Sequence, residues 1–454
     1  MALPFFIVTL THPAWDAAMA CARALPEEAL PELRLDLFPE LDASQLVRDL
    51  GRRCLVSCRR ASEHGRFEGD EDSRLTRLRQ AAEAGPSWLD LEWELEPPPW
   101  LNSLRPGLKV LRSVHVQKGV FDLNERLHSL PEGDAFKWVG QAARLADNAR
   151  LKASLKGAKQ AGLHLSAFLM GPKGVASRCL QRAWGGAFTY AAPDDGVAAA
   201  PGQLKLSTMK KWGCHLADGA TGLCAVMGDP VLHSRGPAFH NQRFQQEGKN
   251  MIYLPLECGD AHEAAEALDP LEILGLSITA PLKESLPLEL GLKGPLNTLW
   301  RRNMSAPWQG ANTDAEALWV ALEQLSPGPV LLLGDGGVAE TTRLLLEQEA
   351  RPFMQISRSA PLPLEAIQAF SPVGVIQATS LGMKAEDPMP FPEHLEAAKP
   401  SLEWAVEWIY KERTAFSNWA KGVDLELVEG GTLFEVQADL QNQQFIEGCG
   451  RSIR

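Results

Sequence analysis

The chain lacks the sequence features of an exported, membrane-bound or metal-binding protein. Its eight cysteines stand singly, without CxxC pairs and without histidines at zinc-ligand spacing. The first residues, MALPFFIVTL, carry no positive charge before their short apolar run, and no apolar run reaches the length of a transmembrane helix. We therefore expect a cytoplasmic protein with reduced thiols, no membrane association and no bound metal.

Positive charge is also scarce. With 45 Lys and Arg against 57 Asp and Glu, the formal net charge is -12. Such a chain repels nucleic acid and anionic membranes, so an anionic ligand needs Arg or Lys side chains placed specifically for it. The composition favours chemistry on small molecules and leaves the oligomeric state open.

The length of 454 residues predicts more than one domain, because single hydrophobic cores stop growing near roughly 250–300 residues. No internal repeat or low-complexity tract is present. The pattern of apolar runs changes after LSTMKKWGCHLADGATG, which places a domain boundary near Asp218.

The first half alternates short apolar runs with helix-length amphipathic stretches. Eight runs have the length and composition of strands: FFIVTL, ELRLDLF, CLVSCR, WLDLEW, KVLRSVH, AFKWVG, LSAFLMG and GAFTYA. Eight such units predict a closed parallel (β/α)8 barrel, in which chemistry gathers at the carboxyl ends of the strands. Polar residues fall within or just after these runs, namely Glu32, Arg34, Arg59, His115, Lys137 and Arg178.

Lys137, inside the apolar run DAFKWVG, is the feature most in need of explanation. A lysine facing a barrel interior is costly as an ammonium, and as an amine it can attack a ketone. The resulting Schiff base acidifies the adjacent C–H bond, and His115, one strand earlier, is a candidate base for that proton. Residue type alone favours the alternatives, a Lys137 that reaches the surface and a structural His115.

Residues 5–210 resemble type I 3-dehydroquinate dehydratases. ELRLDLF, SCRRASEHGRFEG, SVHVQKG, DAFKWVG, FLMGPKGVASR and APGQ stand in that family's order. The resemblance implies that Lys137 forms an imine with the substrate ketone, that His115 moves the C2 proton, and that Glu63 orients the histidine. It implies further substrate contacts from Arg178 and Gln203 at the carboxylate, and from Glu32, Arg34 and Arg59 at the hydroxyls and the mouth. Without the family, surface ion pairs explain the last three about as well.

Two positions depart from the dehydratase pattern. Ala199 replaces the serine four positions before the PGQ glutamine, and Glu63-His64-Gly65 stands in place of the usual EGG. A lid contact is missing in consequence, which affects substrate affinity more than imine chemistry.

The second half alternates strands and helices in the doubly wound manner, through LCAVMGDP, MIYLPLE, ILGLSITAP, VLLLGDGGVAETT, FMQISRS and VGVIQATSLG. VLLLGDGGVAETT is an apolar strand, a glycine-rich turn and a helix, the arrangement that receives a dinucleotide pyrophosphate. FMQISRS ends at Arg358, with no Asp or Glu beside it in the sequence, and an arginine there suits the 2′-phosphate of NADP. A solvated arginine at a strand end is the alternative.

Residues 223–448 resemble shikimate dehydrogenases through GDPVLHSRGPAFHN, LSITAPLK, GPLNTL, GANTD, LLGDGG, IQATSLGM and VQA. The resemblance implies a catalytic pair, Lys283 and Asp314, which otherwise look like a surface charge and a helix N-cap. It implies substrate contacts from Ser234, Asn297, Thr313, Tyr410 and Gln437. The expected NADP-binding residues are Gly334, Gly336, Gly337, Val338, Ala339, Ser357, Arg358 and Thr379.

This half also departs from its family. Gly236 in HSRGP lacks a second hydroxyl for the substrate, Asp335 stands in the phosphate turn, and Glu412 replaces an expected proline. Ser357 and Ser359 flank Arg358 in place of Asn and Thr. An acid in the turn opposes a pyrophosphate unless it points away.

Together these patterns predict a (β/α)8 barrel over residues 1–217, a substrate lobe over 218–325 completed by 432–454, and a Rossmann lobe over 326–431. The expected function is dehydration of 3-dehydroquinate followed by NADPH-dependent reduction of 3-dehydroshikimate to shikimate. Two alternatives stay open: a quinate/shikimate dehydrogenase acting catabolically, and a dehydratase fused to a regulatory module that binds shikimate or nucleotide without catalysis.

Overall fold

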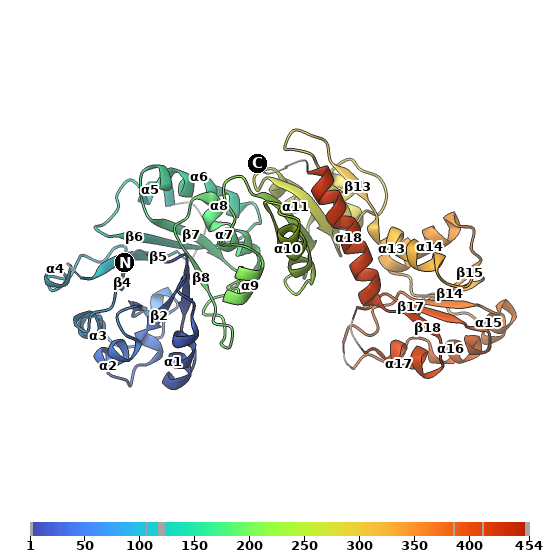
Figure 1. Ribbon diagram of the computed structural model, residues 1–454, viewed down its shortest axis with the longest axis horizontal. Coiled ribbons are helices and arrows are strands. Elements are labelled where there is room, and N and C mark those ends of the chain that lie inside the picture. The colour runs from blue at the N-terminus through green and yellow to red at the C-terminus, as the bar shows by residue number, and fades with distance from the viewer. Residues whose placement is uncertain (1–2, 106, 117–122, 385, 411–412, 450–454) are drawn as a thin grey trace. The chain divides into compact units, whose positions relative to one another are not determined.

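The computed structural model describes residues 3–105, 107–116, 123–384, 386–410 and 413–449 (Figure 1). The chain divides into two compact units, the first ending at Leu274 and the second beginning at Gly275. The first unit therefore continues past Asp218 and holds the strands β9 (Gly222–Gly228) and β10 (Met251–Glu257) together with the N-terminal barrel.

The N-terminal part is built on one eight-stranded sheet with the order β7-β6-β5-β4-β3-β2-β1-β8. Its strands are β1 (Phe6–Thr9), β2 (Ala29–Arg34), β3 (Leu55–Ser57), β4 (Trp88–Glu92), β5 (Lys109–His115), β6 (Ala135–Gln141), β7 (Leu165–Met170) and β8 (Thr189–Ala191). The neighbouring strands pair in parallel. The eight predicted strands are confirmed, with one shift: β2 ends at Arg34, because Leu35–Leu37 forms a 3-10 turn (η1).

The seam between β7 and β8 is closed by a side chain as well as by backbone. The Ser166 hydroxyl donates to the Phe188 carbonyl at 2.5 Å and accepts from the Phe188 N–H at 2.8 Å. Beside it the Ala187 N–H donates to the Leu165 carbonyl at 2.9 Å. The barrel is thus nearly closed, and the serine takes the place of a regular strand ladder.

Helices and short turns connect the barrel strands. They are α1 (Trp15–Ala24), α2 (Ala43–Leu50), η2 (Ala61–Glu63), α3 (Glu71–Glu83), α4 (Leu101–Leu104), α5 (Leu123–Arg126), α6 (Asp147–Gln160), η3 (Pro172–Gly174), α7 (Val175–Cys179), α8 (Gln181–Trp184) and α9 (Leu206–Lys211). Outward strand residues such as Leu33, Val56 and Leu89 pack with residues of these helices in one core cluster. The crossover between β4 and β5 is short and holds only the four-residue helix α4.

Residues at alternate positions of each strand face the barrel interior. Near the amino ends of the strands the inner residues are apolar and form one cluster: Ile7, Leu30, Leu55, Trp88, Leu111, Ala135 and Phe188. Two positions further along the same strands the inner residues are polar and buried: Thr9, Glu32, Ser57, Asp90, Ser113, Lys137 and Tyr190. This second, polar layer places titratable side chains inside the barrel.

A second sheet of five strands has the order β10-β9-β11-β12-β13, with β11 (Ile273–Ile278), β12 (Thr298–Trp300) and β13 (Gln309–Ala311). β9 and β10 pair in parallel, whereas β12 is antiparallel to both of its neighbours. The helices of this region are α10 (Gly236–Gln246), α11 (Ala261–Leu268), α12 (Leu282–Glu289) and α13 (Thr313–Glu323). In the second unit, the C-terminal helix α18 (Gly430–Gly448) packs against α13 and β12.

The third sheet is parallel throughout and has the order β15-β14-β16-β17-β18. Its strands are β14 (Val330–Leu333), β15 (Phe353–Ile356), β16 (Gly374–Gln377), β17 (Trp404–Glu407) and β18 (Glu426–Val428). The remaining helices are α14 (Gly337–Gln348), α15 (Leu364–Phe370), α16 (Pro392–Ala398), η4 (Lys399–Ser401) and α17 (Ala415–Gly422).

This sheet is covered on both faces, which explains its nearly continuous apolar strands. Leu332 and Ile376 pack with residues of α13, α14 and α18 on one face, while Leu331 and Val375 pack with α15, α16 and α17 on the other. The chain leaves β14 for β15 on one side and then returns to β16 on the other. The strand order therefore reverses at β14, and ligands of such sheets bind at the carboxyl end of that point.

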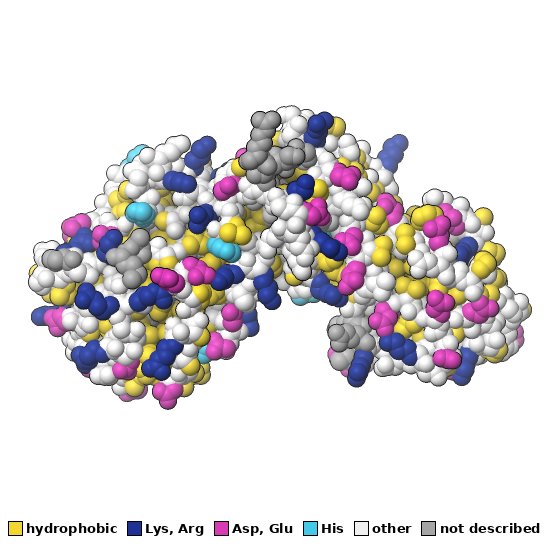
Figure 2. All heavy atoms as spheres, in the orientation of Figure 1, with side chains coloured by type: hydrophobic (Ala, Val, Ile, Leu, Met, Phe, Trp, Pro, Cys, Tyr) yellow, Lys and Arg dark blue, Asp and Glu magenta, His cyan; other side chains and the backbone are white. Residues whose placement is uncertain are grey.

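Charged side chains of both signs are interspersed over the face of the molecule that Figure 2 presents. Among the described residues, no helix combines the length and the apolarity needed to cross a bilayer.

Candidate active sites

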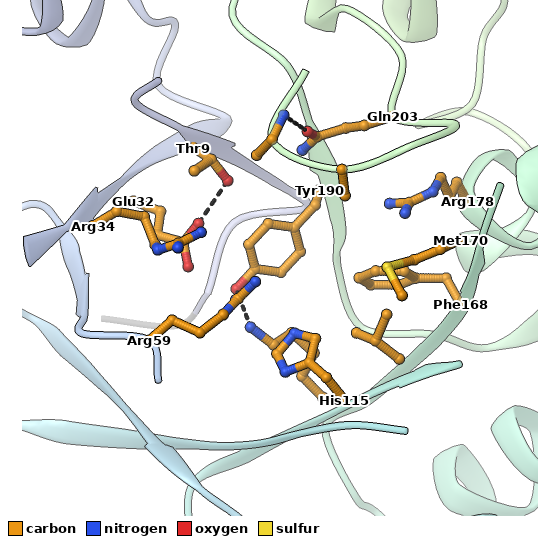
Figure 3. Close-up of a pocket in the computed structure, with 14 residues that line it drawn as sticks. Thr9, Glu32, Arg34, Arg59, His115, Phe168, Met170, Arg178, Tyr190 and Gln203 are labelled. Carbon is orange, nitrogen blue, oxygen red and sulfur yellow. Dashed lines mark hydrogen bonds between the residues drawn. The ribbon is translucent and has the colours of Figure 1, made fainter. Parts of the chain in front are cut away.

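A pocket lies at the carboxyl ends of the barrel strands (Figure 3) and comprises about 380 Å³, including space open to solvent. Its lining residues are Thr9, Glu32, Arg34, Arg59, His115, Lys137, Val139, Phe168, Met170, Arg178, Tyr190, Ala199, Ala200 and Gln203. The barrel thus brings together all the predicted dehydratase residues except Glu63, which contacts the pocket through His115.

Lys137 lies at the floor of this pocket with two polar partners. Its Nζ atom donates to Asp90 Oδ2 at 2.9 Å and to the Tyr190 hydroxyl at 3.3 Å. The Lys137 and Asp90 side chains are only 1% and 4% exposed. Asp90 stabilises the ammonium and is also the nearest base for its proton. Neither partner was predicted from the sequence, which suggested a buried ammonium without a counter-ion.

His115 and Glu63 form a second, partly buried pair. Nδ1 of His115 lies 2.9 Å from Glu63 Oε2, so that Nε2 is left for the substrate. Burial, and then the cations Arg59 and Lys137, lower the pKa of His115 well below its ordinary value. Burial, and then the carboxylates Glu92 and Asp90, raise the pKa of Glu63 to about 7. The histidine is therefore neutral at physiological pH and can accept a proton.

Arg178 is a buried cation whose guanidinium has unused donors. It comes from α7, is 1% exposed and lies over the Phe168 ring at 4.7 Å. Its Nε and Nη2 atoms have no hydrogen-bond partner. Figure 3 shows the guanidinium pointing into the pocket from the side opposite Glu32 and Arg34. Burial lowers its pKa to about 10, so it stays protonated at neutral pH. An anion is the ligand that such a group lacks.

The opposite wall of the pocket is held by internal hydrogen bonds. Glu32 accepts from Thr9 at 2.6 Å and from Ser57 at 3.2 Å. Arg34 donates through Nε and Nη2 to both oxygens of Asp36, the first at 2.7 Å. Asp36 also accepts from the backbone N–H of Arg59 at 3.1 Å, which fixes the start of the Arg59 loop.

The loop after β8 brings Gln203 and Ala199 to the pocket. Gln203 Oε1 accepts the Ala199 N–H at 2.7 Å, so its amide nitrogen is the end that faces a ligand. The same loop is tied to the segment after β1 by His12 Nε2 and Asp195 Oδ1, 3.0 Å apart. Donor atoms of His12, Cys21 and Asp195 lie within 4.8 Å of one another, a proximity that their spacing in the sequence does not indicate.

The loop that carries Glu63 turns sharply at His64 and Gly65, where the sequence differs from the EGG of the dehydratase family. His64 adopts a left-handed conformation at φ 63°, which is costly for a side chain other than glycine. A Cβ atom at Gly65 would lie 2.0 Å from the Arg59 carbonyl oxygen, so only glycine fits there. The loop thus keeps Glu63 in place despite its altered sequence.

In the second unit Lys283 and Asp314 form a close ion pair. Lys283 Nζ donates to Asp314 Oδ2 at 2.6 Å, and the two side chains are 24% and 14% exposed. The N-cap of α13 is Asn312, whose side chain accepts from the Ala315 N–H at 3.2 Å. Asp314 is therefore free of the capping role that its position at a helix start also allowed.

Asn297, Thr313 and Gln437, which were also predicted as substrate contacts, lie close together at the start of α13. Asn297 Oδ1 accepts the Thr313 N–H at 2.9 Å and its hydroxyl at 3.1 Å. The Thr313 hydroxyl lies 3.5 Å from Gln437 Oε1, on α18. Tyr410 follows β17, is 45% exposed and packs on Phe434 of α18, with ring centroids 5.4 Å apart. Ser234, just before α10, belongs to the first unit, where its Oγ accepts the Gly236 N–H at 3.1 Å.

The turn after β14 fits a dinucleotide phosphate. Gly334 adopts φ 115°, and a Cβ there would lie 2.8 Å from the Ala378 carbonyl oxygen and 3.1 Å from the Thr379 nitrogen. At Gly336 and Gly337 a Cβ would meet nothing within 4 Å, so the start of α14 is open. Ala339 is buried and Val338 half-buried, which leaves the backbone N–H groups as the donors of this turn.

The sequence shows no Asp or Glu next to Arg358, but the fold brings an acid, Asp335, to the end of β15. The Ser359 hydroxyl donates to Asp335 Oδ2 at 2.7 Å, and the Ser357 and Ser359 hydroxyls are 2.7 Å apart. Asp335 is distant from Arg358 in sequence, and the pairing of β14 with β15 brings its carboxylate to this strand end.

Comparison with known proteins finds related domains in both halves of the chain. Residues 6–212 match the family model of type I 3-dehydroquinases, and residues 226–288 match that of the shikimate dehydrogenase substrate-binding domain. A chloroplastic bifunctional 3-dehydroquinate dehydratase/shikimate dehydrogenase from Arabidopsis thaliana is 27% identical over 383 residues, which cover 75% of this chain and 62% of the relative.

Solved structures with a similar chain course include dehydroquinate dehydratase and shikimate dehydrogenase from S. pombe. That structure shares 18% identity at a TM-score of 0.42, with 98% of this chain and 96% of the other covered. A shikimate dehydrogenase from Thermus thermophilus, in complex with NADP(H) and shikimate, shares 24% identity at a TM-score of 0.43, with 50% of this chain and 94% of the other covered.

The chain is thus a fusion of two enzyme domains of the α/β class. Its first half is a type I 3-dehydroquinase domain, and its second half begins with a shikimate dehydrogenase substrate-binding domain. The chain is similar over most of its length to the bifunctional 3-dehydroquinate dehydratase/shikimate dehydrogenase from Arabidopsis thaliana, and it spans less than two thirds of that relative's length.

Proposed function

We propose that this chain converts 3-dehydroquinate to 3-dehydroshikimate in the barrel and reduces that product to shikimate in the second half. The single observation that carries the dehydratase assignment is the buried Lys137 beside Asp90, 2.9 Å away, in a pocket that also holds His115 and Arg178. The dehydratase is assigned to residues 1–217 and the reductase to 218–454, with the nucleotide lobe over 326–431.

The barrel residues suit a Schiff-base elimination. Lys137, after passing a proton to Asp90, attacks the substrate ketone, and loss of water leaves an imine. His115 Nε2 removes the C2 proton, and the same nitrogen returns it to the departing hydroxyl as water. Glu63, hydrogen-bonded to Nδ1, stabilises the imidazolium that forms between these steps. Water then releases the product from Lys137, so the net change is the loss of one water.

Arg178 supplies the substrate's anchor. Its unpaired Nε and Nη2 atoms offer a carboxylate two parallel hydrogen bonds in the geometry that a guanidinium favours. Gln203 contributes its amide nitrogen from the loop after β8, while Glu32, Arg34 and Arg59 face the substrate hydroxyls from the other wall. This arrangement orients the ketone towards Lys137.

In the second half Lys283 and Asp314 are the proposed catalytic pair. Lys283 donates a proton to the ketone oxygen as reduction proceeds, and Asp314, 2.6 Å from Nζ, holds the ammonium in place. Asn297, Thr313, Gln437, Tyr410 and Ser234 are the proposed substrate contacts. The hydride comes from the nicotinamide ring when the cofactor is bound.

The proposed cofactor is NADPH. The open start of α14 at Gly336 and Gly337 receives the pyrophosphate, with Gly334, Val338, Ala339 and Thr379 around it. Arg358, which is exposed at the end of β15, pairs with the 2′-phosphate, and Ser357 lies beside it.

One assay tests both halves. Purified protein receives 3-dehydroquinate and NADPH, while enone absorbance and cofactor oxidation are followed in parallel. We expect the enone to form without cofactor and to be consumed when NADPH is added. Enone formation without NADPH oxidation would contradict the reductase and favour a binding module. Oxidation of shikimate or quinate with NAD alone would instead indicate a catabolic dehydrogenase.

A further inference from the structure

Asp335 occupies an unusual place in the nucleotide lobe. It stands in the glycine-rich turn between β14 and α14, where its backbone belongs to the phosphate cradle. Its side chain, however, turns towards the neighbouring strand end and accepts the Ser359 hydroxyl at 2.7 Å. The Ser357 hydroxyl lies 2.7 Å from that of Ser359 and accepts the Ala360 N–H at 3.1 Å, so the three side chains form a connected network.

The network holds Asp335 as an anion. Hydrogen bonds from Ser359 and Ser357, and then the charge of Arg358, lower the pKa of Asp335 below its ordinary value. The carboxylate is solvent-exposed, and Oδ2 accepts the serine hydroxyl. At neutral pH the Asp335 carboxylate and the Arg358 guanidinium therefore lie at the same strand end. Their charges sum to zero.

The end of the strand after the glycine-rich turn is where dinucleotide-binding folds recognise the 2′ position of the adenosine ribose. A carboxylate there accepts hydrogen bonds from a free hydroxyl, whereas an arginine pairs with a 2′-phosphate. Most such sites provide one of the two. This site provides both, with the acid contributed by the turn instead of by the strand.

We propose that Asp335 recognises the 2′ position of the adenosine ribose, accepting a hydrogen bond from a free 2′-hydroxyl and repelling a 2′-phosphate, so that NADH is accepted alongside NADPH. The inference rests on the nucleotide site of the proposed function. It implies that NADPH binds only slightly more tightly than NADH, because Arg358 attracts the 2′-phosphate and Asp335 repels it.

The test uses Asp335→Asn in the full chain, which removes the charge and keeps the shape. Titration calorimetry with adenosine 2′,5′-bisphosphate and with 5′-AMP measures binding without turnover. We expect Asp335→Asn to bind the bisphosphate about tenfold more tightly, a change of about 1.4 kcal/mol, and to bind 5′-AMP no more tightly than the parent protein does. Glu349→Asn, which removes an exposed acid at the opposite end of α14, is the matched control and should change neither.

Ionic strength separates charge repulsion from a structural effect. Because Asp335 is exposed, the difference between the parent protein and Asp335→Asn should shrink as salt rises. Equal tightening of both nucleotides would place the repulsion at the 5′-phosphate and overturn the inference, as would unchanged affinity for the bisphosphate. If neither protein binds either nucleotide, the cofactor site itself is wrong and the inference fails with it. If both nucleotides bind and Asp335→Asn has no effect, the inference on Asp335 is wrong, while the proposed cofactor site stands.

Discussion

Glu63 Oε2 lies 2.9 Å from Nδ1 of His115, between side chains that are 14% and 5% exposed. The same burial moves the two groups in opposite senses: it raises the pKa of Glu63 to about 7 and lowers that of His115 well below its ordinary value. The imidazole is therefore neutral, and the carboxylate that orients it gains a proton as the pH falls through about 7.

The dehydratase should accordingly lose activity as pH falls through about 7. Above that value Glu63 is ionised and accepts a hydrogen bond from the Nδ1–H group of His115, which leaves Nε2 as the base. Below it Glu63 is protonated, the imidazolium is no longer stabilised, and kcat falls. Glu63→Gln should lower kcat and remove this acid limb from the profile of kcat against pH. An unchanged limb in that variant would assign it to another group.

Lys137 should be the residue that carries the substrate covalently. Borohydride added with 3-dehydroquinate should reduce an imine, and peptide mapping should place the added mass on Lys137. Lys137→Ala should abolish dehydration and leave the reduction of supplied 3-dehydroshikimate intact, because separate side chains perform it. Lys109→Ala, at the start of the adjacent strand β5, is the matched control and should keep both activities. Mass found on another lysine would refute the assignment.

Arg178→Met should weaken substrate binding without lowering the thermal stability of the protein. Loss of the paired hydrogen bonds to the substrate carboxylate should cost about 1.5–3 kcal/mol, or roughly ten- to a hundredfold in KM. Thermal stability should not fall, because the variant removes a buried cation whose Nε and Nη2 are unpaired.

Arg112 gives the contrast needed for that experiment. It is equally buried, and its Nε and Nη1 atoms are also unpaired, but its Nη2 donates to the Trp93 carbonyl at 3.1 Å and also to that of Leu95. Arg112→Met should therefore lower the Tm and leave KM unchanged. A fall in Tm for Arg178→Met without a change in KM would show that Arg178 is structural.

Much of the barrel follows from strand period and length, because each inner residue lies two positions from the next. The pattern places Lys137, His115 and Glu32 inside without any tertiary information. Asp90 could have been found in the same way, as an acid two positions after Trp88 in an apolar strand. The proximity of His12 to Asp195 could not, since it depends on closing the barrel across 183 residues.

The second half was harder to predict for two physical reasons. β12, β13 and β18 have three residues each, and the eightfold strand repeat that helps to place the equally short β3 and β8 is absent here. The contact between Asp335 and Ser359 depends on the pairing of β14 with β15 and on the rotamer of one exposed side chain. Local sequence therefore predicted the glycine-rich turn but assigned no direction to the acid within it.

Lys283→Met should lower the turnover of the reductase far more than it lowers substrate affinity. The proton that Lys283 supplies is needed mainly in the transition state, and positioned proton donors contribute about 10²–10⁴-fold to rates. Steady-state reduction of 3-dehydroshikimate measures both constants. Lys293→Met, an exposed lysine in the following loop, serves as control. An unchanged kcat in Lys283→Met would remove this residue from the mechanism and favour a binding module.

Arg358→Ala should weaken NADPH binding more than NADH binding. A guanidinium facing a 2′-phosphate forms a charge-assisted pair, whose loss should cost about 1.5–3 kcal/mol, or roughly ten- to a hundredfold in affinity. The net charge of -12 gives no background attraction for a polyanionic cofactor, so the local arginine must provide it. Because Arg358 is exposed, the difference in NADPH affinity between the parent protein and Arg358→Ala should shrink as salt rises.

Arg343→Ala tests whether any cation of this lobe would have the same effect. Arg343 lies in α14, where it pairs with Glu340 at 2.6 Å and Glu347 at 2.5 Å, and its loss should leave the affinities for both cofactors unchanged. Fluorescence titration of NADPH and NADH on the three proteins measures all the affinities directly. Equal weakening of the two cofactors by Arg358→Ala would place this arginine at the pyrophosphate or the adenine, and the 2′-phosphate would then need another partner.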